Sequence, residues 1–226
     1  MDFERLRLPV FNADHSFPEI KAQLQTDIDD LFYFLQENYN LVTLAIETNF
    51  GGIVEAAGKR IEYLSFVKRD FLGYFSRIVA KVNEKSESRQ LIGIVNQFDY
   101  LFQIHDSIND LFDVKRSMNE NYVELQSDIL LLVRAMSSET LGLFNDIHKS
   151  IVANEPIDIR LRAQELQAEF DEVNKELLRL MADPLRRDAG ALTNFITYSQ
   201  RLKDKLVNFC EVRAKARDHN TPAIPE

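Results

Sequence analysis

The 226-residue sequence contains one cysteine, Cys210, and no tryptophan. A single cysteine cannot form an internal disulfide bond, so a disulfide-stabilised secreted scaffold is excluded and a reducing compartment is favoured. No uninterrupted apolar stretch approaches the roughly 20 residues that a transmembrane helix needs. The N-terminal residues 1–5 carry acids and no apolar run follows them, so they do not form a secretory signal. We therefore expect a soluble cytoplasmic protein without direct membrane insertion.

Positive charge is also in short supply. The chain has 27 Lys and Arg residues against 36 Asp and Glu residues, which gives a formal net charge of −9. Nucleic acids and anionic membrane surfaces repel a protein of this charge, and no segment of the sequence is strongly basic. Nucleic acid is therefore not expected as a partner.

Glycine and proline, with 7 and 6 copies, fall mainly where helices are expected to break. Between these breaks the apolar residues recur with a period near 3.6 residues, which is typical of amphipathic helices. Ser16 and Glu19 have the spacing of a capping box and predict the first helix start. The stripes predict six helices, the first with apolar residues over 20–45 and the others over 53–82, 91–112, 118–151, 159–180 and 192–209.

Long helices joined by short loops form bundles, so the predicted fold class is all-α. The stripes also predict a set of almost fully buried residues. These are Phe71, Phe98, Phe112, Leu132, Phe170, Leu202 and Phe209.

The two halves of the chain are alike. Residues 103–112 and 201–210 have apolar residues and an Asp at the same places, which indicates a duplicated three-helix unit. We expect an irregular N-terminal arm and a polar tail around the two units. The predicted segments are 1–15, 16–114, 115–217 and 218–226.

Acidic residues gather on one face of the third predicted helix. Asp99, Gln103, Asp106, Asp110 and Asp113 are spaced by four, three, four and three residues and share a face. Four carboxylates in one stripe repel each other, and a divalent cation or basic residues of a neighbour would relieve this repulsion. Oxygen ligands suit Mg²⁺, Ca²⁺, Mn²⁺ or iron. The alternative is a solvated polar face, which every surface helix has.

Residues that could perform catalysis are few. No nucleophile motif, phosphate-binding glycine loop or cysteine metal pair is present. His105 is expected to be a partly buried imidazole bonded to a neighbouring helix, and Cys210 a small core residue. The sequence predicts that the protein is not an enzyme and indicates no definite cofactor beyond a candidate divalent cation.

Two segments carry a resemblance to a known family, whose motif reads Glu-Arg-Ile-Gly-Asp-x-x-x-Asn-Ile. Residues 200–209 keep its Arg201, Asp204 and Asn208, and residues 102–111 keep Ile and Asp106. On these residues, roughly 20–216 of the chain resemble the PhoU-like domains. This family comprises phosphate-uptake regulators and the cytosolic C-terminal domains of bacterial sodium/phosphate cotransporters.

The resemblance implies a regulator of phosphate transport or phosphate signalling. Its partner would be a membrane phosphate transporter or a signalling protein, which would place the chain at the inner membrane indirectly. The oligomeric state stays open, with a homodimer as one candidate.

Some family members bind metal through the Glu and Asp of the motif. Here the Glu positions hold Phe102 and Gln200, so Asp106 and Asp204 remain as matches and no multinuclear cluster is expected. Asp99 and Asp110 would extend the first site by one helical turn in each direction.

Two other functions remain as alternatives. The first is a carboxylate-rich metal-binding helical protein, although the Glu-x-x-His pairs of di-iron bundles are missing. The second is a plain helical scaffold or interaction protein.

Overall fold

The computed structural model describes residues 3–155, 157–180, 182 and 188–218. Within these residues there are helices and no strands, which confirms the predicted all-α fold class. The helices are α1 (Phe17–Thr48), α2 (Gly51–Lys81), α3 (Lys85–Glu120), α4 (Ser127–Ala153), α5 (Ile159–Leu180) and α6 (Ala189–Asp218). None of the helices in these ranges is long and apolar enough to cross a membrane.

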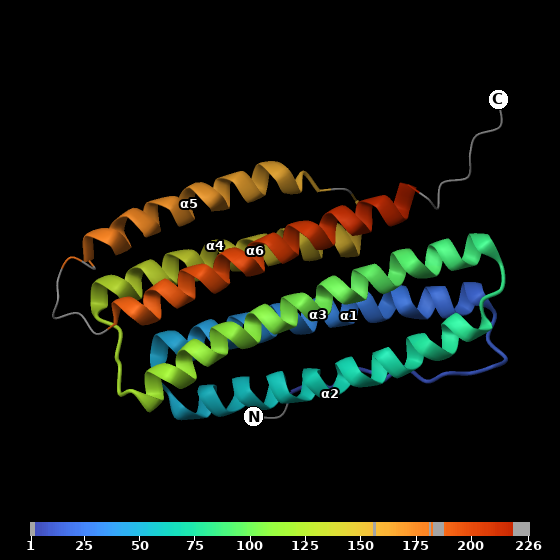
Figure 1. Ribbon diagram of the computed structural model, residues 1–226, viewed down its shortest axis with the longest axis horizontal. Coiled ribbons are helices and arrows are strands. Elements are labelled where there is room, and N and C mark those ends of the chain that lie inside the picture. Colours follow the sequence, from blue (N-terminus) through green and yellow to red (C-terminus); the bar gives the residue numbers. More distant parts are fainter. Residues whose placement is uncertain (1–2, 156, 181, 183–187, 219–226) are drawn as a thin grey trace.

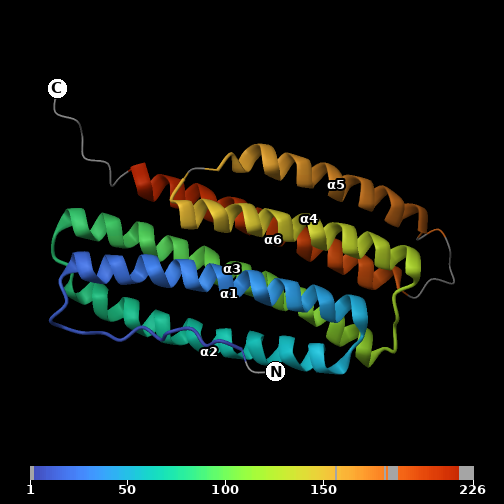
Figure 2. The same ribbon diagram turned by 180° about the vertical axis from the view of Figure 1, so that it is seen from behind.

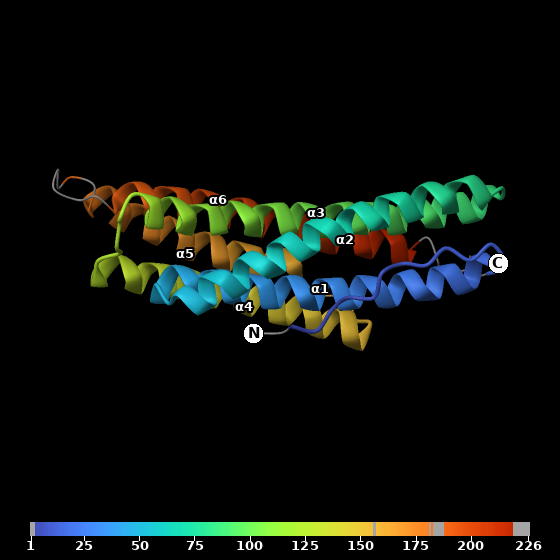
Figure 3. The same ribbon diagram turned by 90° about the horizontal axis from the view of Figure 1, so that it is seen from below.

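The helices lie along one long axis, and successive helices run in opposite directions (Figure 1). Helices α3 and α6 pack side by side on one face, and α1 and α4 pack on the opposite face (Figures 1 and 3). Helix α2 packs against α1 and α3 at one edge, and α5 packs against α4 and α6 at the other. The first three helices and the last three therefore form two groups, which meet through α1–α4 and α3–α6.

Aromatic side chains fill the core. Phe32 of α1 packs against Phe144 of α4 and Phe209 of α6, with ring centroids 5.6 and 5.4 Å apart. A second cluster between α2 and α3 places the ring of Phe98 4.8 Å from that of Phe71. These contacts connect the two helix groups at the centre and stabilise α2 against α3.

The predicted core residues are buried, with one exception. Leu132 is only partly buried, because its neighbour Val133, with Ile129 and Met136, takes the core-facing side of α4. The prediction for Leu132 was therefore wrong by one helical position.

The helix ends have identifiable chemistry. Glu19 accepts a hydrogen bond of 2.7 Å from the backbone N–H of Ser16, as the capping-box spacing predicts. Asn49 follows the last residue of α1 and has a left-handed backbone with φ of 50°. Asn154 follows the last residue of α4 with a φ of 54°, and the N–H of Glu155 donates to the carbonyl of Ser150. This six-to-one bond is the Schellman arrangement that satisfies the last carbonyls of a helix.

The fourth helix differs from the prediction. Met118 belongs to α3, and residues 121–126 form a non-helical connection before α4 begins at Ser127. Tyr122 has a φ of 52°, and the N–H of Val123 bonds the carbonyl of Met118 in another Schellman motif. The unit boundary predicted between 114 and 115 thus falls inside α3, and the connection between the helix groups lies several residues later.

Residues 3–15 form no helix or strand and run along α1 and α2 as the predicted arm (Figure 2). Phe3 packs against Phe34 of α1 and Tyr63 of α2, with ring centroids 5.9 and 5.5 Å apart. Of the predicted tail, residues 219–226 lie outside the described residues.

Candidate functional site

The acidic stripe of α3 faces a neighbouring helix at Asp106. The Lys68 ammonium of α2 lies 3.0 Å from Oδ2 and 3.1 Å from Oδ1 of this carboxylate. Asp99 accepts a 2.6 Å hydrogen bond from Gln103 within α3, and Asp113 pairs with Arg116. Each of these three carboxylates therefore has a partner in the protein.

Asp110 is a partly buried carboxylate of the stripe. Burial raises the pKa of Asp110, and the nearby Asp113 and Asp106 raise it further. The positive charge of Arg201 on α6 acts against this shift and lowers the pKa. Lys68 and Arg201 are thus basic residues from neighbouring helices that relieve the repulsion within the stripe, one of the two solutions that its spacing suggested.

The residue before each motif Asp is buried and bonded to the outer helix of its group. His105 is 2% exposed, and its Nε2 lies 3.1 Å from the Ser65 hydroxyl of α2. Lys203 is 8% exposed, and its ammonium donates to the Gln167 side chain of α5. Asp106 and Asp204 follow these residues and are both exposed. This shared pattern supports the duplication, and it confirms the expected bond from His105 to a neighbouring helix.

Burial lowers the pKa of His105 to about 4, so the imidazole is neutral near pH 7. Its Nδ1 is buried without a hydrogen-bond partner in the described structure. An imidazole held neutral in this way is typical of a core histidine, and the geometry does not complete a nucleophilic triad. Cys210 is buried as expected, and burial raises the pKa of its thiol to about 12.

In the described part of the chain, the motif helices gather no metal-binding group of side chains. Across the described residues, no three or more His, Cys, Asp or Glu side chains group in a way that could hold a metal ion. Lys68 neutralises Asp106, while Asp204 on α6 has the Lys203 ammonium 3.5 Å from its Oδ1. The described residues therefore do not fit the metal cluster that some members of the PhoU-like family bind.

Two features of this molecule were not predicted from the sequence. The counter-charges Lys68 and Arg201 come from other helices, and spacing within one helix carries no signal for them. Asp27 is a buried carboxylate on α1, 6% exposed. A signal for Asp27 existed, because it stands three residues after Leu24 and four before Leu31, on the apolar stripe of its helix.

Comparisons with known proteins give similarity in structure only. No protein-family model matches the sequence, and no curated protein matches it. The structure is similar to PhoU from Pseudomonas aeruginosa, with a TM-score of 0.73 and 15% identity over 89% of this chain and 97% of that one. It is equally similar to the phosphate transport system regulatory protein PhoU from Streptococcus pneumoniae, with a TM-score of 0.73, 17% identity and the same coverage of 89% and 97%.

The chain has the PhoU-like fold. Within this fold, α3 and α6 are the last helices of the two groups and carry the two motif segments. His105 and Lys203 occupy the motif position at which the PhoU-like pattern has glycine. Their side chains reach α2 and α5, so the space beside each motif Asp contains protein atoms.

Proposed function

We propose that this chain is a non-catalytic regulator of phosphate transport or phosphate signalling. It acts by binding a membrane phosphate transporter or a signalling protein on the cytoplasmic side of the inner membrane. The observation that carries this proposal is the PhoU-like fold, which extends over 89% of the chain and is shared with a phosphate transport system regulatory protein.

The proposed contact surface is the acidic stripe of α3, formed by Asp99, Asp106 and Asp110, with Asp204 of α6 as the matching motif residue. Asp99 and Asp106 are exposed and Asp110 is partly exposed, so their charges are accessible to a partner. A basic surface on the partner would compete with Lys68 and Arg201 for these carboxylates. Such charge complementarity selects partners and speeds association.

A gene deletion in the native host tests the function. Uptake of radiolabelled phosphate is measured in the deletion strain under phosphate excess and under starvation. We expect the dependence of uptake on external phosphate to be lost and then restored by the native gene. Uptake that keeps its native dependence on phosphate in the deletion strain would contradict the proposed function.

Rescue with charge variants tests the surface. The triple variant Asp99→Asn, Asp106→Asn and Asp110→Asn should fold but fail to restore regulation. A matched variant of α5, Asp171→Asn with Glu172→Gln and Glu176→Gln, removes the same charge from another surface helix and should restore it. Equal rescue by both variants would place the partner surface elsewhere on the protein.

A further inference from the structure

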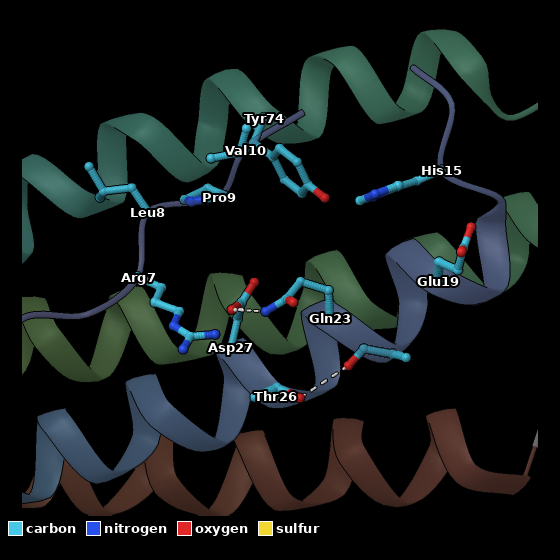
Figure 4. A pocket seen from close by; sticks show the side chains of 11 residues that line it. Arg7, Leu8, Pro9, Val10, His15, Glu19, Gln23, Thr26, Asp27 and Tyr74 are labelled. Atoms are coloured by element: carbon cyan, nitrogen blue, oxygen red, sulfur yellow. Dashed lines mark hydrogen bonds between the residues drawn. The ribbon is translucent and has the colours of Figure 1, made fainter. Parts of the chain in front are cut away.

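The N-terminal arm and the helices beneath it enclose a cleft of about 600 Å³ (Figure 4). Ligand-binding pockets commonly measure about 300–1,000 Å³, so the cleft has room for a small organic molecule. Its lining includes Arg7, Val10 and His15 of the arm, Gln23 and Asp27 of α1, and Tyr74 of α2.

The arm is attached to the helices on both sides of this cleft. On one side, the Tyr63 hydroxyl donates a 3.0 Å hydrogen bond to the carbonyl of Leu6. On the other side, the Lys81 ammonium donates to the carbonyls of Ala13 and His15. Between these attachments Phe11 packs edge-on against Tyr74, with ring centroids 6.5 Å apart. The arm therefore forms a fixed wall of the cleft.

Asp27 lines the cleft with a buried carboxylate that is only partly hydrogen-bonded. Its Oδ1 accepts a 2.9 Å hydrogen bond from the Gln23 amide, whereas Oδ2 is buried and has no partner in the described structure. Burying a carboxylate without full hydrogen bonding costs free energy. Burial also raises the pKa of Asp27 to about 6, against the Gln23 hydrogen bond and the charge of Arg7, which lower it. A donor group that entered the cleft would satisfy Oδ2.

Two further residues that line the cleft suggest which ligand chemistry would suit it. Tyr74 of α2 lines the same cleft as Asp27 (Figure 4). A cleft lined by both an aromatic ring and a carboxylate favours an ammonium group. Arg7 also lines the cleft, and its guanidinium points toward Asp27 without a hydrogen bond between them (Figure 4). A purely cationic ligand would be repelled by Arg7, whereas a ligand of both charges would find a partner for each.

We propose that this cleft binds a small organic zwitterion. Its ammonium donates to Oδ2 of Asp27 beside the ring of Tyr74, and its carboxylate or phosphate pairs with Arg7. A bare metal ion fits less well, because the cleft offers one buried carboxylate and much more volume than an ion fills. This inference is independent of the proposed partner surface, which lies on α3.

The test is an NMR titration of the ¹⁵N-labelled full chain with 4-aminobutyrate as the probe. We expect saturable shifts of the backbone amides around Arg7, Gln23, Asp27 and Tyr74. Butyrate leaves the buried Asp27 unpaired and should bind at least about tenfold more weakly. Butylamine leaves the exposed Arg7 unpaired and should also bind more weakly, by a smaller factor.

Variants identify the contacts. Asp27→Asn keeps the side-chain shape and should weaken binding of 4-aminobutyrate at least about tenfold. Asp171→Asn removes an equal charge from an exposed site on α5, which does not line the cleft, and should leave binding unchanged. Arg7→Ala, on the exposed part of the arm, should weaken 4-aminobutyrate but not butylamine, and it tests the site even if the Asp27 variant does not fold.

Three results would overturn the proposal. The first is the absence of saturable shifts with millimolar 4-aminobutyrate in the native protein. The second is equal weakening by Asp27→Asn and Asp171→Asn, which would indicate general attraction to an acidic surface. The third is equal binding of butylamine and 4-aminobutyrate, which would show that Arg7 does not contact the ligand and that the site does not select a zwitterion.

Discussion

The Lys68 ammonium lies 3.0 Å from Oδ2 of Asp106 and connects α2 to the acidic stripe of α3. The two side chains are 32% and 58% exposed, so solvent weakens their attraction. A double-mutant cycle with Lys68→Ala and Asp106→Ala, measured by urea unfolding, should give a coupling free energy of about 0.2–1 kcal/mol. The coupling should shrink in about 1 M salt. A coupling that stays constant with salt would show that the contact is not electrostatic.

The same contact leads to a prediction about divalent cations. Lys68 and Arg201 already oppose the negative charge of the stripe. We therefore expect millimolar Mg²⁺ or Mn²⁺ to change the melting temperature of the native protein by no more than it changes that of the double variant Asp106→Asn/Asp110→Asn. A ligand specific to the folded protein must raise its melting temperature by mass action. A rise seen in the native protein and absent from the double variant would place a cation on the stripe and favour the metal-binding alternative.

The aromatic cluster between α2 and α3 should dominate the stability of that pair. Phe98 is 0% exposed and packs 4.8 Å from Phe71 and 5.0 Å from Phe75, measured between ring centroids. Phe98→Ala should lower the free energy of unfolding by about 3–5 kcal/mol, because it leaves a cavity. Leu72→Ala, on the same pair of helices at 54% exposure, should change it by less than about 0.5 kcal/mol. Equal losses in the two variants would mean that Leu72 packs against another chain.

The helical architecture is predictable from this sequence because its apolar periodicity is regular and its caps are local. Ser16 and Glu19 lie three residues apart, so their contact is encoded within one helical turn. The end of α3 was missed for the opposite reason. No glycine or proline interrupts residues 118–129, and the apolar residues continue in helical register through Tyr122 and Leu125. The helix nevertheless ends at Glu120, and Tyr122 has a left-handed backbone two residues later.

The candidate site was predictable only where it depends on spacing within one helix. The spacing of Asp99, Asp106 and Asp110 predicts their common face, since all three belong to one helix. Lys68 is separated from Asp106 by 38 residues, so its role depends on how α2 packs against α3. Helix packing is a tertiary property, and the periodicity of a single helix does not specify which polar residues face each other across two helices.

Two buried groups should give the protein opposing pH responses. The pKa of Asp27 rises from an ordinary 3.8 to about 6 in the folded protein, so its contribution to stability is present below pH 3.8 and lost as the pH rises through about 6. The pKa of His105 falls from 6.5 to about 4, so its contribution is present above pH 6.5 and lost as the pH falls through about 4. In the native protein these slopes oppose each other between about pH 4 and 6, where the two windows overlap.

Single variants should separate the two slopes in urea unfolding measured across this range. Asp27→Asn removes the buried charge and should raise the free energy of unfolding at pH 7 by on the order of 2 kcal/mol. Its stability should then increase with pH, because His105 remains. His105→Asn should lose stability as the pH rises, because Asp27 remains. Other carboxyls with raised pKa values, Asp29, Glu47 and Asp110, are present in both variants, so they cancel in the comparison. Parallel pH profiles for the two variants would show that neither group is buried in the state that the structure describes.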